Sequence, residues 1–322
     1  MGRAAQASDF IPVDLKRLRP DSSLGFSLYQ NSANAGRVLL IGPQERLEES
    51  TRLSLLRAGI PVFILRRDRN LYYTHLERHL SRLVQGAKAD PKEAAEAVHE
   101  LASEVMKRVF EDPNDDNLVQ ARQVIKASVD LIVSSDQALA NLLRLAQHDY
   151  YTYIHSINVG LFGLGLAKLL GRKGQSFDLQ ALGLAFFFHD IGKMRIDQNI
   201  LNKPGPLTDK ELEEVHQHSR LGMEMMEELG LLTPEARSVV LEHHERYDGS
   251  GYPQGLSREE IHPYARICAV VDVFDALTSD RPYRSRMQAV PALRLMTEQM
   301  EGHFDQGLLQ GFIEMFGRYG KP

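Results

Sequence analysis

The chain has 322 residues, a hydrophobic fraction of 43% and a formal net charge of -5. This length allows two domains, and the mild acidity argues against binding to nucleic acid polymers, which requires a basic face. The single cysteine, Cys268, excludes a disulfide within the chain and fits a reducing compartment. The first residues lack the apolar core of a signal peptide, and residues 150–170 are interrupted by polar side chains. We therefore expect a cytoplasmic protein with no membrane partner.

Residues 1–85 predict a small α/β domain with a regulatory or sensory role. A short edge strand is expected at residues 10–13, within a stretch that is otherwise irregular up to residue 35. Apolar runs at residues 38–42 and 60–65 predict strands, and residues 44–57 between them predict a helix. This order is typical of a β–α–β unit, so we expect the two strands to be parallel.

Residues 86–139 predict a helical linker. Pro91 suits the first position of a helix that extends to about residue 110, and a second helical pattern begins at Leu118. These helices could carry a signal, bind a signalling protein or form a dimer interface, and the sequence leaves these alternatives open.

From residue 140 onward, histidines and aspartates occur on segments that should be buried. His155 faces inward because Val159, Phe162 and Leu166 follow it at helical spacing. His189 and Asp190 follow an apolar run, and burying them is costly unless they pair with each other or bind a metal.

Three more segments add to this set. His218 shares the apolar face of a helix predicted over residues 211–229, whereas His216 falls on the polar flank and is expected at the surface. His243 and His244 end a helix before a glycine-containing turn. Asp272 lies in a run that is apolar on all sides, with Asp275 one turn later as its support. Mixed imidazole and carboxylate ligands suit iron, manganese, nickel or zinc.

These motifs resemble the HD-GYP domain, a branch of the HD phosphohydrolase family. The resemblance covers residues 140–322 and rests on the segments 189–193, 243–253 and 272–284. It implies an all-helical bundle that hydrolyses the bacterial second messenger cyclic di-GMP at a centre of two or three metals. The expected fold is therefore mainly α, with an HD-type helical bundle after a small N-terminal α/β domain.

The resemblance also implies roles for single residues. The metal ligands would be His189, Asp190, His218, His243, His244 and Asp272, with His155 as a further ligand. Asp190 and Lys193 would serve catalysis, and Lys193 would contact a phosphate. The substrate would also meet Gly251, Tyr252 and Pro253 of the signature loop and the guanidinium groups of Arg281 and Arg284.

One departure from the family pattern concerns the number of metals. Members with three metals carry a glutamate four residues before the first ligand histidine, and Tyr151 occupies that position here. We therefore expect two divalent ions, with iron or manganese as the first candidates before nickel or zinc. A metal-activated hydroxide is expected to open cyclic di-GMP to linear pGpG, with onward cleavage to GMP less favoured. Two alternatives stay open: action on a hybrid cyclic dinucleotide, and a non-catalytic domain that senses a cyclic dinucleotide or binds a partner.

Overall fold

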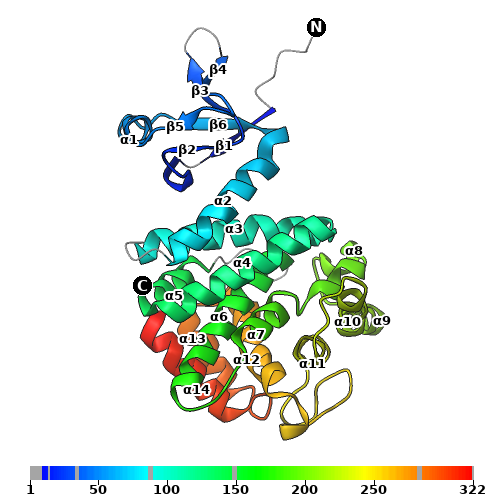
Figure 1. The fold of residues 1–322 in the computed structure, drawn as a ribbon. Helices are drawn as coiled ribbons and strands as arrows, with labels where there is room; N and C mark the ends of the chain where they lie inside the picture. Colours follow the sequence, from blue (N-terminus) through cyan, green and yellow to red (C-terminus); the bar gives the residue numbers. More distant parts are fainter. Residues whose placement is uncertain are drawn as a thin grey trace. The chain divides into compact units, whose positions relative to one another are not determined.

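The computed structural model describes residues 9–13, 15–32, 36–85, 90–146, 151–280 and 285–320. The chain divides into two compact units, residues 1–88 and 89–322 (Figure 1). Arg281 and Arg284, which the sequence assigns to substrate binding, lie outside the described residues.

The smaller unit contains a four-stranded antiparallel sheet with the strand order β1-β6-β3-β4. Its strands are β1 (Phe10–Val13), β3 (Leu28–Ser32), β4 (Gly36–Ile41) and β6 (Val62–Leu65). The other elements are β2 (Ser22–Ser23) paired with β5 (Arg46–Leu47), the helices α1 (Glu49–Arg57) and α2 (Arg69–Gln85), and the single turns η2 (Leu15–Arg17) and η3 (Arg66–Asp68).

The predicted β–α–β unit is wrong in its pairing. Strands β4 and β6 run in the same direction, but β3 lies between them and is antiparallel to both. Strand β3 was not predicted because its second half, Gln30 to Ser32, is polar and contains no apolar run. The predicted strand at residues 10–13 is β1, and it does lie at an edge of the sheet.

Among the described residues of the larger unit, every regular element is a helix, which confirms the predicted mainly α fold class (Figure 1). Its first helices are α3 (Pro91–Glu111), α4 (Asp115–Ser134), α5 (Asp136–Leu145), α6 (Thr152–Arg172) and α7 (Leu179–Phe187). They are followed by η4 (Ile191–Arg195), α8 (Gln198–Leu201), α9 (Asp209–His216), α10 (His218–Glu228) and α11 (Pro234–Glu242). The last are η5 (Arg258–Glu260), α12 (Pro263–Thr278), α13 (Ala289–Glu298) and α14 (Gln306–Tyr319).

Helix α6 is the core of this unit. It packs against α3, α7, α12 and α14, so both of its long sides are covered by apolar side chains. Among the described helices it is also the one long and apolar enough to cross a membrane, but 89% of its apolar window is buried inside the unit. The composition of α6 is therefore explained by its place in the protein core. Helices α3 and α4, which the sequence assigns to a linker, belong to this unit as well.

Capping residues that are recognisable in the sequence determine where the helices near the site begin. The Thr208 side chain accepts a hydrogen bond from the backbone N–H of Glu211, and the Glu211 side chain accepts one from the backbone N–H of Thr208. This is the predicted capping box. Thr233 caps α11 with Pro234 in its first turn. The single helix expected over residues 211–229 is in fact two, because the chain turns at Gln217 and a new helix, α10, begins at His218.

Candidate metal centre

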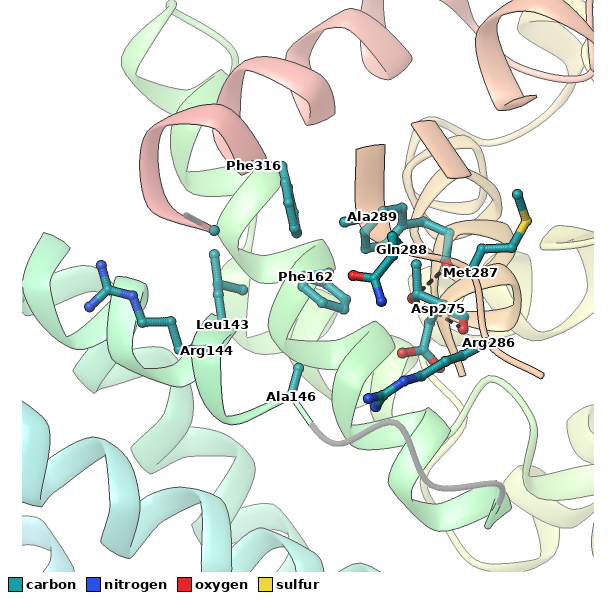
Figure 2. Close-up of a pocket in the computed structure, with 13 residues that line it drawn as sticks. Leu143, Arg144, Ala146, Phe162, Asp275, Arg286, Met287, Gln288, Ala289 and Phe316 are labelled. Atoms are coloured by element: carbon teal, nitrogen blue, oxygen red, sulfur yellow. Dashed lines mark hydrogen bonds between the residues drawn. The ribbon is translucent and has the colours of Figure 1, made fainter. Parts of the chain in front are cut away.

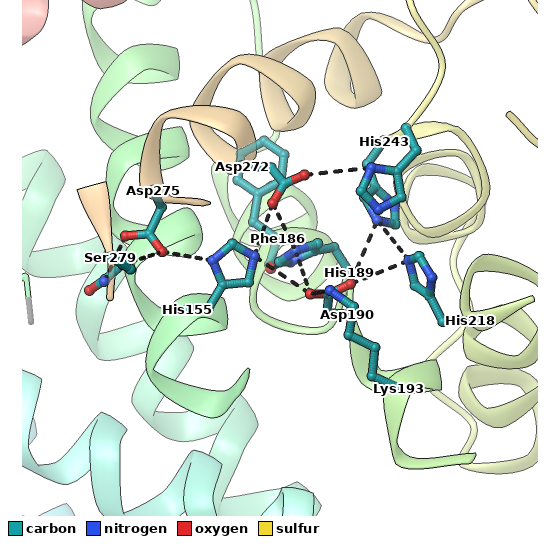
Figure 3. Close-up of polar contacts among 12 residues, drawn as sticks. His155, Phe186, His189, Asp190, Lys193, His218, His243, Asp272, Asp275 and Ser279 are labelled. Atoms are coloured by element: carbon teal, nitrogen blue, oxygen red, sulfur yellow. Dashed lines mark hydrogen bonds and ion pairs between the residues drawn. The ribbon is translucent and has the colours of Figure 1, made fainter. Parts of the chain in front are cut away.

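Five segments of the larger unit bring buried imidazoles and carboxylates to one place (Figure 3). These side chains come from α6, the segment between α7 and η4, the start of α10, the end of α11, and α12. They are His155, His189, Asp190, His218, His243, His244 and Asp272. All are buried except His244, whose side chain is 23% exposed. The sequence therefore selected side chains that the fold does bring together.

A glycine makes this convergence sterically feasible. Gly192 lies against the start of α10 so closely that a Cβ atom on it would be 1.9 Å from the carbonyl oxygen of His218 and 2.4 Å from the backbone nitrogen of Gly222. Any larger residue would push η4 away from α10. The close approach sets Asp190 Oδ1 only 3.4 Å from His218 Nε2.

Backbone carbonyls fix the orientation of three of the imidazole rings. In each ring Nδ1 donates to a carbonyl oxygen of the preceding helical turn, so Nε2 carries the lone pair and faces the cluster. The pairs are His189 with Phe186 at 2.8 Å, His218 with Val215 at 2.6 Å, and His243 with Val239 and Val240 at 3.0 Å. This tautomer is the one that a metal ligand requires.

The side chains fall into two groups that share one carboxylate. His155, His189 and Asp190 form the first group, and Asp190, His218, His243 and His244 form the second. Within each group, the potential ligand atoms lie within 4.8 Å of one another. Asp272 adjoins both groups, since its oxygens lie 2.9 Å from His155 Nε2 and 3.7 Å from His244 Nδ1. The arrangement can accommodate a cation on either side of Asp190.

Two buried atoms of this cluster are left without a hydrogen bond in the described part of the chain, namely His189 Nε2 and Asp190 Oδ1. Leaving such atoms unsatisfied costs about 1–3 kcal/mol each unless another partner is supplied. A divalent cation is the partner that a lone-pair nitrogen and a carboxylate oxygen share. The donor set therefore fits the metals that the sequence suggests.

Asp190 is kept ionised by its neighbours. Burial alone would raise its pKa, but the Lys193 ammonium group and the nearby imidazoles hold that pKa well below its usual range. Lys193 contacts Asp190 Oδ2 directly from one helical turn away. The carboxylate is thus in its metal-binding form across the physiological pH range.

His155 differs from the other imidazoles because it bonds carboxylates through both nitrogens. Burial would lower its pKa, but hydrogen bonds to Asp272 at 2.9 Å and Asp275 at 2.7 Å outweigh this effect and raise the pKa to about 9. By contrast, burial lowers the pKa of His218 to about 3 and that of His244 well below its usual value. Metal-free, the centre therefore holds a charged His155 beside neutral imidazoles.

The signature loop after α11 is tied down by a residue that the sequence did not single out. Glu245 is almost fully buried, and its carboxylate accepts hydrogen bonds from the backbone N–H groups of Gln254 at 2.7 Å and Leu256 at 3.1 Å. Gly251 packs so tightly against residue 245 that a Cβ atom would lie 2.5 Å from its Cα. The loop is therefore anchored at its base.

The ring of Tyr252 in this loop stacks on two histidines. Its ring centroid lies 3.7 Å from that of His216 and 4.8 Å from that of His244, with interplanar angles of 18° and 28°. The expectation that His216 is a plain surface residue was wrong. No periodicity could have revealed this contact, because the turn at Gln217 reorients His216 and the loop reaches it from elsewhere in the chain.

Asp275 connects the centre to a separate cavity of about 400 Å³ (Figure 2). The aromatic rings of Phe162 and Phe316 line this cavity, and the side chains of Arg144 and Arg286 lie at its edge. Tyr151, at the position where a third-metal glutamate would stand, occupies the N-cap position of α6 without a side-chain cap hydrogen bond, and the residue is 58% exposed.

A model of the HD domain family matches residues 126–308, more than half of the chain. Cyclic di-GMP phosphodiesterase PA4108 of Pseudomonas aeruginosa is 42% identical over 188 residues, which are 58% of this chain and 45% of the relative. The cyclic di-GMP phosphodiesterase response regulator RpfG of Xanthomonas campestris pv. campestris is 38% identical over 161 residues, 47% of this chain and 40% of the relative. The 3'3'-cGAMP-specific phosphodiesterase 1 of Vibrio cholerae is 34% identical over 202 residues, 60% of this chain and 44% of the relative.

The matching segments span less than half the length of these relatives. Among solved structures, Bd1817 of Bdellovibrio bacteriovorus, described as an HDG"Y"P protein, superposes with a TM-score of 0.67 over 96% of this chain and 100% of its own. Its sequence identity is 20%, so this likeness concerns the fold. Residues His243–Pro253 carry the pattern by which the chain resembles the HD-GYP branch. The chain belongs to the HD domain family.

Proposed function

We propose that this protein is a metal-dependent phosphodiesterase that opens cyclic di-GMP to linear pGpG at a centre of two divalent cations. The observation that carries the proposal is the position of Asp190, which belongs to both groups of prospective ligands. One cation would be held by His155, His189 and Asp190. The other would be held by Asp190, His218, His243 and His244, with Asp272 beside both.

The relatives support this class of substrate. Two of them are named for cyclic di-GMP, and the Vibrio cholerae relative is named for 3'3'-cGAMP. Cyclic di-GMP is the first candidate because the most similar of the three, at 42% identity, bears its name. The hybrid cyclic dinucleotide is the second.

The protein's own residues would hold the reacting groups and offset charge. Bound cations would lower the pKa of a water molecule and polarise the phosphodiester. Lys193 lies against Asp190, so its ammonium group is close enough to stabilise charge that develops on a phosphoryl oxygen. Tyr252 is engaged on both faces by histidines, which favours a role in holding the loop shut over stacking on guanine. Arg281 and Arg284 stay proposed contacts for the nucleotide.

Two cations, rather than three, are proposed because Tyr151 offers no carboxylate. The mixed imidazole and carboxylate donors suit iron or manganese. We also propose that residues 1–85 form a regulatory domain, which the separate compact unit at residues 1–88 supports.

The direct test is to mix the full chain, loaded with manganese or ferrous iron, with cyclic di-GMP and to follow the products by chromatography. We expect pGpG to accumulate, and Asp190→Ala to abolish turnover while circular dichroism shows an intact fold. Elemental analysis should find two ions per chain. Tight binding of cyclic di-GMP without turnover would instead identify a sensor, and three ions per chain would contradict the argument from Tyr151.

A further inference from the structure

A cavity of about 640 Å³ includes Lys193 in its wall. Three parts of the larger unit line it: the last turn of α3, the start of α6, and the segment from η4 to α8. The side chains that matter here are Phe110, Glu111, Tyr151, Tyr153 and Gln198. None of them belongs to the prospective metal ligands, so the cavity is a neighbour of the centre and not a part of it.

Lys193 connects this cavity to the centre. Its ammonium group contacts Asp190, the carboxylate shared by both groups of prospective ligands, while its side chain also forms part of the cavity wall. A phosphodiester held at Asp190 and Lys193 therefore has the cavity beside it. In a cyclic dinucleotide, the group nearest to the phosphodiester and large enough to fill such a space is a nucleoside.

The wall of the cavity has the chemistry of a base-binding site. The rings of Tyr151 and Tyr153 are stacked at 5.5 Å with an interplanar angle of 21°, and Phe110 adds a third aromatic side chain. Nucleobases stack on aromatic side chains at about 1–3 kcal/mol per base. Tyr151 is 58% exposed, and it brings an aromatic ring to this wall where a metal ligand would need a different side chain.

Glu111 supplies the polar group that can distinguish one purine from another. Its side chain is 64% exposed and forms an ion pair with Lys107 at 3.9 Å, a loose i,i+4 pair that a ligand can displace. An ionised carboxylate only accepts hydrogen bonds. The Watson–Crick edge of guanine presents two adjacent donors, N1–H and N2–H, whereas that of adenine presents one donor beside an acceptor. Glu111 can therefore form a bidentate pair of hydrogen bonds with guanine but not with adenine.

We propose that this cavity is a guanine subsite, in which Tyr151 stacks on the base and Glu111 reads its edge. The inference rests on the proposed hydrolysis of a cyclic dinucleotide and names its specificity-determining residue. Glu111 ends α3, which lies before the segment that matches the family model at residues 126–308. Base selection would then come from a helix outside the segment that the family model matches.

The test compares the full chain with Glu111→Gln, using Glu93→Gln as a matched control because Glu93 is an exposed carboxylate in the first turn of the same helix. A glutamine can donate to N1 and accept from N6 of adenine, but with a single acceptor oxygen it cannot form the carboxylate's bidentate pair with N1–H and N2–H of guanine. We expect Glu111→Gln to lower the ratio of kcat/KM for cyclic di-GMP over cyclic di-AMP by about tenfold or more, as loss of a hydrogen bond to a charged group implies. Glu93→Gln should keep the ratio of the native chain.

Equilibrium binding of the same two nucleotides to the metal-free full chain separates this proposal from the proposed function. A guanine preference that Glu111→Gln removes would support the subsite even if the metal-loaded protein hydrolyses neither nucleotide. An unchanged preference in Glu111→Gln, or an equal loss for both nucleotides, would overturn it even if cyclic di-GMP is hydrolysed. Tyr151→Phe should retain the binding of both nucleotides and Tyr151→Ala should weaken it, because stacking needs the ring and not the hydroxyl.

Discussion

His155 Nδ1 lies 2.7 Å from Asp275 Oδ2, and this hydrogen bond determines which nitrogen of the ring faces the cluster. The other carboxylate oxygen of Asp275 accepts a hydrogen bond from Asn158 at 2.8 Å, so the acceptor is itself held in place. Asp275 thus orients His155 without belonging to either group of prospective ligands.

Asp275→Asn should weaken metal binding by about ten- to hundredfold, the usual cost of losing the partner that orients a ligand histidine. Manganese affinity can be measured by equilibrium dialysis. Ser279→Ala is the matched control, because Ser279 donates to the same carboxylate at 3.2 Å but does not touch His155. An affinity for Asp275→Asn equal to that of the native chain would rule out the orienting role.

Lys193→Met should destabilise the metal-free protein more than the metal-loaded one. Without metal, Lys193 is the cation in direct contact with the buried carboxylate of Asp190, beside the imidazoles, and breaking such a pair costs about 3 kcal/mol. A bound cation would replace that charge, so the difference in unfolding free energy should shrink when manganese is added. Urea unfolding with and without metal measures both values.

The control for that experiment is Lys126→Met. Lys126 pairs with Asp130 at a similar distance, 2.7 Å, but on an exposed helix surface. Its loss should cost about 0.5 kcal/mol and should not depend on metal. If Lys193→Met proved equally mild, Asp190 would have to draw its stabilisation from the imidazoles alone.

Glu245→Ala should release the signature loop. It would remove the charged acceptor of the N–H groups of Gln254 and Leu256, at a cost of about 2 kcal/mol in unfolding free energy. Hydrogen exchange at these two amides should become faster, while Glu301→Ala, an exposed control, should leave it unchanged. Native exchange rates in Glu245→Ala would mean that the packing of Gly251 alone holds the loop.

His99 on α3 should make the protein sensitive to mild acid. Burial lowers its pKa to about 4, so the folded protein keeps His99 neutral while the unfolded chain takes up a proton near pH 6.5. Between these two pH values the unfolded state binds a proton that the folded state does not bind. The contribution of His99 to the free energy of unfolding is therefore fully present above about pH 6.5, and the free energy of unfolding falls by about 3 kcal/mol as the pH drops toward 4.

His99→Gln should reduce this pH dependence. Urea unfolding of the metal-free chain and of the variant at pH 7 and pH 4.5 gives the two slopes, and the contributions of other titrating groups cancel in their difference. Parallel slopes would show that His99 is already protonated in the native protein.

Local signals in the sequence account for much of the fold. The capping box at Thr208 and Glu211 and the Thr233-Pro234 start placed two helices correctly, because a cap depends on neighbouring residues alone. Helix α6 was recognisable as a core helix from its composition. Strand β3 was missed because its stability comes from its hairpin partner β4 and its neighbour β6, and not from its own residues.

In the candidate site, too, local sequence signals revealed some residues and not those that depend on distant contacts. The imidazoles and carboxylates of the centre were found because their residue types are unusual on apolar segments. His216 and Glu245 were not found. The role of His216 depends on the Tyr252 ring, which belongs to a distant loop, and the role of Glu245 depends on backbone N–H groups nine and eleven residues later. Glu111 gave no signal in the sequence either, because exposed carboxylates are common at helix ends. Only the structure shows that it lines a cavity together with residues of α6 and η4.

The side chains of the centre are spread from His155 to Asp272, so the last contributor is synthesised more than one hundred residues after the first. During translation the nascent polypeptide lacks Asp272 until most of the chain has left the ribosome. A truncated product that ends before α12 would carry every histidine of the set and still be incomplete. Premature termination or proteolysis in this region therefore removes one carboxylate of the centre together with the helix that carries it.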